Sequence, residues 1–359
     1  MLEEQLNQLY EGYGYRKFRM SKFEDYDLYA QNKDFLKKGH IITFTDVDGS
    51  LKALKPDITL SIIKNNSGDS EKVYYNENVC REVGGAFREI LQVGVESVGQ
   101  IDPYAEAEVI ALAAKSLKIL SEDYVLDLSD VSFIRCLLGG MNLSQRDQEQ
   151  ALALISQKNA PGIQSMADRG ILTAQDAQAI QELMGIYAPL KEGIAQAGRL
   201  ARDNQSWEIL RQLSVTASML EAFGLNGRIR LDFSLVNSMD YYNGVIFQGF
   251  LPNIPFPALS GGRYDNLPRK MGKQVGAIGF ALYMGRLEQY FSQERQYDAE
   301  VLLTYGPDAD LAKLAAFAEQ IRAKGCTVRC EREMGPSAPV RCRTKVRYYD
   351  GLRPEEVSL

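Results

Sequence analysis

The sequence is very poor in histidine. Among its 359 residues, His40 is the single one. One imidazole excludes metal sites built from several histidines, and it leaves little room for acid–base catalysis by histidine. His40 follows the run Lys37-Lys38-Gly39, which is typical of a surface turn. We therefore expect other side chains to form any functional site.

Cysteine is also scarce. The chain has five cysteines, at positions 80, 136, 326, 330 and 342. An odd number of scattered cysteines fits reduced thiols, so we expect a cytoplasmic protein. The last three have no histidine near them and match no common zinc spacing, so we expect no metal site. No other cofactor is indicated by the sequence.

Long apolar runs are absent. No stretch approaches the ~20 apolar residues of a transmembrane helix, and residues 1–5 are polar and acidic, unlike a signal peptide. We therefore expect no membrane association. The formal net charge of −6 implies no general affinity for nucleic acid. The length suits two or three domains, and a hydrophobic content of 45% is enough for a buried core.

The most informative stretch is residues 72–99. Two runs with β-forming residues flank a polar turn that contains Gly84 and Gly85, which predicts a β-hairpin. Arg81 and Arg88 flank the turn, and the planar fork of each guanidinium group suits a carboxylate or a phosphate. An ordinary exposed hairpin fits the same residues.

The return strand of this hairpin has a polar face. Gln92 and Glu96 share that face because side chains alternate along a strand, and Gly94 lies between them. We expect the glycine to leave open space above the sheet. Gly276 and Gly279, in a later strand pattern, indicate close approach of the backbone to a ligand or a helix.

Five motifs in order resemble the histidyl-tRNA synthetases. The hairpin pattern, Arg-Glu, a short loop, Arg-Glu, two residues and then Gln-x-Gly-x-Glu, resembles the second signature of class II aminoacyl-tRNA synthetases in its histidyl form. The other four resemble further segments of that family, and they are Leu-Lys-Pro-Asp-Ile-Thr (54–59), Asp-Tyr-Tyr-Asn-Gly (240–244), Gly-Gly-Arg-Tyr-Asp-Asn-Leu (261–267) and Gly-Phe-Ala with Arg-Leu (279–287). The resemblance covers roughly residues 1–290.

This resemblance implies an α+β fold, with a class II synthetase-like antiparallel sheet flanked by helices. The core would span residues 1–295. Alanine, glutamine and leucine dominate from about 131 to 223, which predicts a helical insertion at the place where the synthetases carry one. Residues 296–359 are expected to form a small α/β unit, a truncated form of the anticodon-binding domain.

Local patterns predict individual elements. Asp102-Pro103 indicates a helix start, and a second helix is expected to begin at Pro56. A strand–turn–strand pattern covers residues 41–54. Near the end of the chain, basic residues alternate with others from Arg341 to Arg347, which predicts a strand with one basic face. That face could bind phosphate or an acidic partner, or it could be a solvated edge protected by charge.

The resemblance also implies a pocket for a histidine-like ligand. Asp57 and Glu96 would favour an ammonium group, and tyrosines would supply flat walls with a polar tip. The residues expected to line the pocket are Asp57, Thr59, Arg81, Gln92, Glu96, Tyr241, Tyr242 and Tyr264. Arg88 and Arg286 are candidates for binding an anion. An inherited pocket without a ligand is the alternative.

Several departures from the synthetase pattern argue against catalysis. Asn237 stands where those enzymes have an arginine, and Ser238 replaces a glycine. The hairpin loop is shorter than theirs, Gly285 stands where glutamate is usual, and the tail after Asp298 is shorter than an anticodon-binding domain. We therefore expect no catalytic residues and no charging of tRNA.

With these departures, the sequence resembles another family, the regulatory subunits of ATP phosphoribosyltransferase. The resemblance implies a non-catalytic subunit that acts with a short-form catalytic subunit in the first step of histidine biosynthesis, with feedback regulation by free histidine. It also implies a homodimer through residues 1–60 within a mixed assembly, with neither tRNA nor membrane as a partner. Two alternatives stay open, namely an active but divergent histidine–tRNA ligase and a free-standing amino-acid-binding protein.

Overall fold

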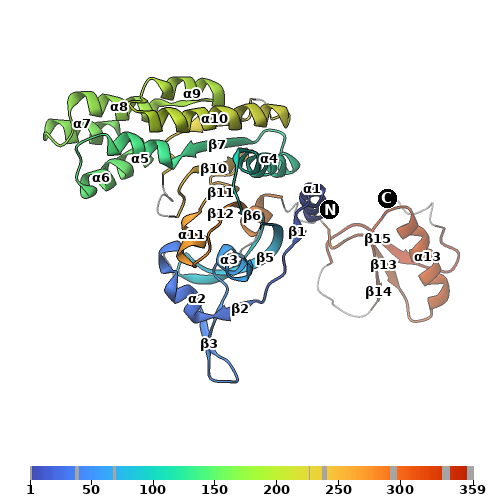
Figure 1. Cartoon of the computed structure of the whole chain (residues 1–359). Helices are drawn as coiled ribbons and strands as arrows, with labels where there is room; N and C mark the ends of the chain where they lie inside the picture. Colours follow the sequence, from blue (N-terminus) through green and yellow to red (C-terminus); the bar gives the residue numbers. More distant parts are fainter. Residues whose placement is uncertain are drawn as a thin grey trace. The chain divides into compact units, whose positions relative to one another are not determined.

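The structure is a computed structural model, and it describes residues 2–36, 40–67, 70–225, 227–236, 241–291, 297–333 and 340–353. The chain divides into two compact units, Met1–Leu287 and Glu288–Leu359, which are drawn in Figure 1. Within the described ranges, none of the helices combines the length and the apolar character needed to cross a bilayer.

The first unit is built on a large sheet. Nine strands of the described chain form it, in the order β1-β5-β6-β12-β11-β10-β7-β9-β8. Neighbouring strands are antiparallel except in the pairs β1/β5 and β7/β9. The strands are β1 (Arg16–Lys17), β5 (Glu71–Val83), β6 (Ala86–Gly99), β7 (Val125–Asp130), β8 (Tyr187–Pro189), β9 (Ile229–Asp232), β10 (Val245–Phe250), β11 (Leu259–Arg263) and β12 (Gly276–Leu282). The predicted antiparallel sheet and the α+β class are confirmed.

The hairpin β5–β6 is the longest pair in this sheet. Arg81 lies opposite Arg88, and the strands join through Gly84 and Gly85. Both glycines have positive φ, 61° and 80°, as expected for a tight two-residue hairpin turn. Glycine adopts this conformation without the steric penalty that other residues carry, which is why the dipeptide predicts the turn correctly.

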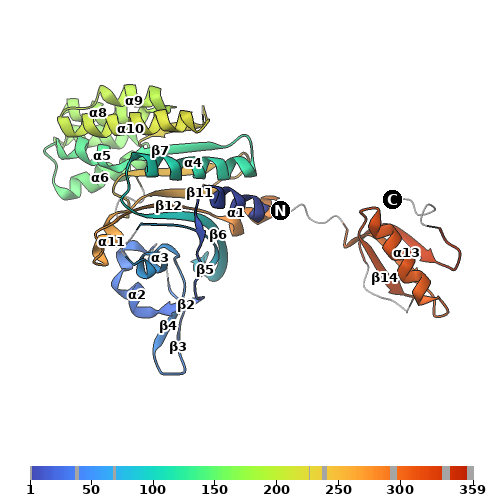
Figure 2. The same cartoon turned by 45° about the vertical axis from the view of Figure 1, so that its right-hand side comes forward.

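Strand alternation gives this sheet a core on each face. Tyr74, Val93 and Val95 belong to one buried cluster, whereas Val73 and Tyr75 belong to the other. Figure 2 shows helices on both sides of the sheet. The first cluster includes residues of α1 (Leu2–Gly12) and α4 (Pro103–Leu120), and the second includes residues of α2 (Tyr26–Gln31) and α3 (Thr59–Asn65).

One predicted helix start is confirmed and one is wrong. The Asp102 side chain accepts a hydrogen bond from the Ala105 amide at the start of α4, as expected of an N-terminal cap. Helix α3, however, begins at Thr59 and not at Pro56. Pro56 therefore lies outside the helix, and its carbonyl oxygen accepts a hydrogen bond from Arg81 Nε.

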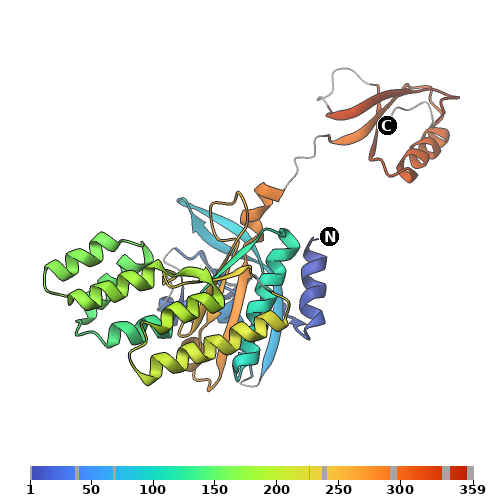
Figure 3. The same cartoon turned by 90° about the horizontal axis from the view of Figure 1, so that it is seen from above.

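The helices predicted between 131 and 223 are present, and Figure 3 shows them grouped together. They are α5 (Val131–Gly139), α6 (Gln145–Ser156), α7 (Ala160–Asp168), α8 (Ala174–Gly185), α9 (Leu190–Gly198) and α10 (Asn204–Ala222). Thr173 caps α8 by accepting a hydrogen bond from the Asp176 amide at 3.1 Å. The short strand β8 was not predicted from the composition of this stretch.

The remaining elements of the first unit are small. The predicted strand–turn–strand near residues 41–54 is confirmed as two strands of a separate three-stranded sheet. That sheet contains β2 (Phe23–Asp25), β3 (Thr43–Thr45) and β4 (Leu51–Leu54). The helices not yet named are the 3₁₀ helix η1 (Lys33–Phe35), α11 (Asn266–Lys270) and α12 (Met284–Phe291), which begins in the first unit and runs past its last residue, Leu287.

The second unit is a parallel three-stranded sheet with one helix in its described part. Its elements are β13 (Ala299–Tyr305), α13 (Leu311–Ala323), β14 (Val328–Arg332) and β15 (Cys342–Tyr348), with strand order β14-β13-β15. Leu303, Phe317 and Ile321 belong to its small core. Along β15 the exposed side chains are Arg343, Lys345 and Arg347, so the predicted basic face is present.

Candidate ligand-binding site

A cavity of about 350 Å³ lies on the face of the main sheet that carries α3. Strands β6, β10, β11 and β12 contribute to its lining, together with the start of α3 and the segment before β10. The structure brings all eight predicted pocket residues to this one cavity, and they are Asp57, Thr59, Arg81, Gln92, Glu96, Tyr241, Tyr242 and Tyr264. Their role in binding a ligand stays a prediction.

Glu96 is the most buried acid of the cavity, with 2% of its surface exposed. The Thr59 hydroxyl donates to Oε1 at 2.8 Å, and the Tyr264 hydroxyl donates to Oε2 at 2.5 Å. Burial raises the pKa of Glu96 to about 8, and the nearby charge of Asp57 acts in the same direction, while the two donated hydrogen bonds oppose the shift. At neutral pH the carboxyl group is therefore largely protonated.

The space directly above Gly94 is not open, contrary to the prediction. A Cβ atom there would lie 2.6 Å from the Tyr75 hydroxyl and 2.0 Å from the Phe280 carbonyl oxygen. The Tyr75 hydroxyl itself donates a hydrogen bond to that carbonyl at 3.2 Å. Gly94 thus makes room for a tyrosine ring from the neighbouring strand. Tyr75 also lines the cavity, although it was not among the residues predicted to do so.

The close approach predicted at Gly276 and Gly279 is to acidic side chains of the protein rather than to a helix. A Cβ atom at position 279 would lie 1.7 Å from Glu96 Oε2. One at position 276 would lie 2.8 Å from Asp265 Oδ1. The two glycines therefore leave room for two buried carboxyl groups.

Tyrosine rings form one wall of the cavity. The ring centroids of Tyr241 and Tyr242 are 4.7 Å apart, and those of Tyr241 and Tyr264 are 5.4 Å apart. Phe35 contacts Tyr241 edge-on, with a centroid separation of 5.9 Å. Burial raises the pKa of Tyr264 well above its ordinary value, so its hydroxyl stays neutral. Such a wall combines flat apolar surface with polar tips.

The polar end of the cavity contains Asp57, Arg81 and Gln92. Arg81 Nη2 lies 3.5 Å from Asp57 Oδ2, and Arg81 Nε donates to the Pro56 carbonyl at 2.7 Å. The guanidinium charge is therefore partly neutralised within the protein. Gln92 is 3% exposed, and its side chain makes no hydrogen bond within the described part of the chain. Its amide can thus pair with a ligand.

A second cavity, of about 1000 Å³, adjoins the first. Asp57, Arg81 and Gln92 line both. Arg286, one of the two residues proposed for anion binding, lines the larger one. Its guanidinium carbon lies 3.9 Å from the centroid of the Phe256 ring, so the group is stacked on an aromatic face.

Two other residues discussed in the sequence, Arg88 and His40, do not line the smaller cavity. Arg88 is exposed and lines neither cavity. His40 lines the larger cavity, and its Nδ1 lies 2.5 Å from Glu82 Oε2. Asn237 and Ser238, which carry the departure from the synthetase pattern, lie outside the described residues.

The chain is similar to known proteins over most of its length. A curated ATP phosphoribosyltransferase regulatory subunit from Oceanobacillus iheyensis is 29% identical over 316 residues, which is 85% of this chain and 78% of that protein. The solved structure of an ATP phosphoribosyltransferase regulatory subunit/histidyl-tRNA synthetase from Bacillus halodurans superposes with a TM-score of 0.81 at 22% identity, covering 96% of this chain and 92% of that chain.

A solved ATP phosphoribosyl transferase (HisG:HisZ) complex from Thermotoga maritima contains a chain with the same fold. Its TM-score is 0.62 at 17% identity, over 79% of this chain and 96% of that one. A family model described as histidyl-tRNA synthetase matches residues 1–287, which is most of the chain. The protein therefore belongs to the histidyl-tRNA synthetase family, and it is similar to curated members that are regulatory subunits of ATP phosphoribosyltransferase.

Proposed function

We propose that the protein is a non-catalytic regulatory subunit of ATP phosphoribosyltransferase. It would act with a short-form catalytic subunit in the first step of histidine biosynthesis. The observation that carries this proposal is the match, over 85% of the chain, to a relative that bears this name. The fold it shares with a chain of the Thermotoga maritima complex supports an assembly with a catalytic partner.

The residue at position 237 supports a loss of synthetase chemistry. Activation of an amino acid needs a donor aimed at charge that develops in the transition state, and one such donor is worth about 3–4 kcal/mol. Asn237 is neutral and short, so it cannot supply the charge of the arginine that it replaces.

The smaller cavity is proposed to bind free histidine. Asp57 offers a carboxylate to the ligand ammonium group, and the Gln92 amide can orient that group by hydrogen bonding. Glu96 and the tyrosine wall would enclose the side chain. A regulatory effect requires histidine to bind two states of the complex with different affinity.

The homodimer proposed for residues 1–60 has an exposed apolar surface available. Phe23 and Phe44 are 42% and 37% exposed, and their rings contact each other edge-on with centroids 5.4 Å apart. Phe23 lies on β2 and Phe44 on β3, the two outer strands of the small sheet, with β4 between them. Aromatic residues are enriched at protein interfaces. The second unit is proposed to be related to the anticodon-binding domain, without tRNA as a partner.

Mixing experiments test the assignment. The purified protein and a short-form catalytic subunit are sedimented alone and together, and a heavier species should form only in the mixture. Calorimetry with histidine should show binding that weakens in Glu96→Ala. If the mixture gives no heavier species and the catalytic rate is unchanged, the regulatory assignment fails.

A second candidate function is supported by one observation, namely that all eight predicted residues line a single cavity. That arrangement fits a free-standing amino-acid-binding protein equally well. Histidine binding without any effect on the catalytic subunit distinguishes this candidate from the regulatory subunit.

A further inference from the structure

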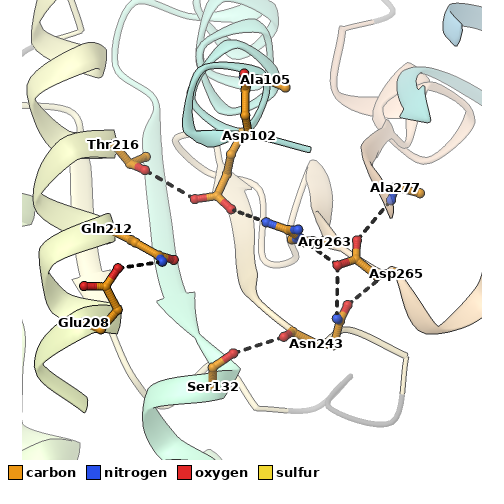
Figure 4. A network of polar contacts seen from close by, with 11 residues as sticks. Asp102, Ala105, Ser132, Glu208, Gln212, Thr216, Asn243, Arg263, Asp265 and Ala277 are labelled. Carbon is orange, nitrogen blue, oxygen red and sulfur yellow. Dashed lines mark hydrogen bonds and ion pairs between the residues drawn. The ribbon is translucent and has the colours of Figure 1, made fainter. Parts of the chain in front are cut away.

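Two segments that carry tyrosines of the cavity wall are joined by a pair of side chains, Asn243 and Asp265 (Figure 4). The Asp265 amide donates to Asn243 Oδ1 at 2.8 Å, and Asn243 Nδ2 donates to Asp265 Oδ2 at 3.4 Å. The backbone N–H of Asn243 also donates a hydrogen bond to the backbone carbonyl of Arg263 at 3.0 Å. Asn243 directly follows Tyr242, and Asp265 directly follows Tyr264, so the pair holds the two segments in register.

Asp265 is itself fixed in place. It is 4% exposed, and its Oδ1 accepts a hydrogen bond from the Ala277 amide on β12 at 3.0 Å. Its Oδ2 accepts a second bond from Arg263 Nε at 2.9 Å. Gly276 gives this carboxylate its space, because a Cβ atom there would lie 2.8 Å from Oδ1. The carboxylate therefore has one position relative to the sheet.

Arg263 extends the network away from the cavity. Its Nη1 lies 3.7 Å from Glu106 Oε2 on α4, and Glu106 Oε1 accepts a hydrogen bond from the Thr216 hydroxyl on α10 at 3.3 Å. Figure 4 shows the region between these helices and Asn243. The Asn243–Asp265 pair is thus connected, through two further residues, to the helices on the far side of the sheet.

We propose that Asn243 and Asp265 are positioning residues for the histidine cavity, although neither lines it. The pair sets the distance between the Tyr242 and Tyr264 backbones and with it the shape of the aromatic wall. A displacement of well under ~1 Å in such a wall is enough to weaken a shaped binding site. The identity of the ligand rests on the proposed function, whereas the positioning role itself does not.

Two asparagine variants test this role. Asn243→Ala removes both side-chain bonds to Asp265, and calorimetry should show histidine affinity about tenfold lower, in a variant whose circular dichroism spectrum is unchanged. Asn78→Ala is the matched control, since it removes one hydrogen bond from an exposed asparagine to Glu89 on the hairpin. Its affinity should equal that of the wild type. Equal affinities in all three proteins would overturn the proposal.

A conservative change adds a signature that a general loss of stability would not produce. In Asn243→Asp the new carboxyl oxygen would lie close to Asp265 Oδ2, so one proton must be shared for the contact to form. The ratio of its histidine affinity to that of Asn243→Ala should therefore increase as the pH falls from 8 to 6. A ratio that does not change with pH would contradict a direct role for this contact.

A measurement without ligand separates this proposal from the proposed function. Fluorine NMR of protein with 3-fluorotyrosine at position 264 reports the environment of that ring. The resonance should shift or broaden in Asn243→Ala and stay unchanged in Asn78→Ala. If the wild type binds no histidine, the proposed ligand is wrong, but this spectrum still decides the positioning role. An identical resonance in all three proteins overturns it.

Discussion

Glu96 on β6 lies opposite Gly279 on β12, and its carboxyl group fills the space that a side chain at position 279 would need. This relationship explains how a long acidic side chain fits over the middle of a sheet. It also fixes Glu96 where Thr59 and Tyr264 can donate hydrogen bonds to its two oxygens. A glycine on one strand thus determines the geometry of an acid on the next.

The first prediction follows from this contact. In Gly279→Ala the Glu96 carboxyl group must move, so its hydrogen bonds from Thr59 and Tyr264 are strained and the free energy of unfolding falls by about 1–3 kcal/mol. Calorimetry should show weaker histidine binding as well. Gly139→Ala is the control, because a Cβ atom there meets nothing within 4 Å. Unchanged stability and binding in Gly279→Ala would contradict this description of the site.

The second prediction concerns pH. The pKa of Glu96 is about 8 in the folded chain, against an ordinary value of 4.5. Between these values the folded state keeps a proton that the unfolded chain releases. The contribution to stability is therefore complete below pH ~4.5, and it is lost as the pH rises to ~8, at up to about 1.4 kcal/mol per pH unit.

Glu96→Gln removes this titration. Urea unfolding at pH 5, 6, 7 and 8 should give a smaller fall in unfolding free energy for the variant than for the wild type. Burial also raises the pKa of Glu106 to about 7 and of Asp127 to about 6. Both groups lower the unfolding free energy as the pH rises, and they do so equally in the wild type and the variant. The difference between the two plots of unfolding free energy against pH therefore reports Glu96 alone. Parallel curves would show that Glu96 is ionised in the fold.

Local chemistry made much of the fold and the site predictable. Gly84-Gly85 identifies its hairpin because the turn requires positive φ. The grouping of the eight cavity residues came from the resemblance of their motifs to those of the histidyl-tRNA synthetases, which carries information that periodicity lacks. In contrast, the filling of the space above Gly94 by Tyr75 depends on the neighbouring strand. The Asn243–Asp265 pair likewise depends on two segments meeting in space.

The exact bounds of helices and strands were harder to predict from the sequence. The pattern predicted that α3 begins at Pro56, but the Asp57 side chain accepts a hydrogen bond from the Leu60 amide, and the helix begins after it. Strand β11 was not predicted as a strand, since its Gly261-Gly262 pair has low strand propensity. Close packing selects glycine there, because a Cβ atom at position 261 would lie 2.4 Å from the Gly279 carbonyl oxygen.

The third prediction is a homodimer through the N-terminal region. Sedimentation at micromolar concentration should show a dimer for the wild type. Phe44→Glu should shift the protein to monomer, because it places a charge in the proposed apolar contact. Tyr187→Glu is the control, since Tyr187 is also exposed, at 47%, but lies outside residues 1–60. A monomeric wild type would contradict the dimer.

The fourth prediction is the absence of amino-acid activation. Histidine and ATP should give no pyrophosphate exchange at a rate typical of synthetases. Asn237→Arg alone should not restore exchange, because the hairpin loop is also short and Arg81 is engaged with Asp57. Exchange by the wild type at a synthetase-like rate would favour an active histidine–tRNA ligase.

The most direct test of the regulatory role is the rate at which a short-form catalytic subunit forms phosphoribosyl-ATP, measured with and without this protein and with and without histidine. The rate should be higher when the protein is present. Histidine should shift the apparent affinities of the complex by roughly 5–150-fold, the usual size of coupling between sites. A rate that is the same with and without the protein would contradict the regulatory role.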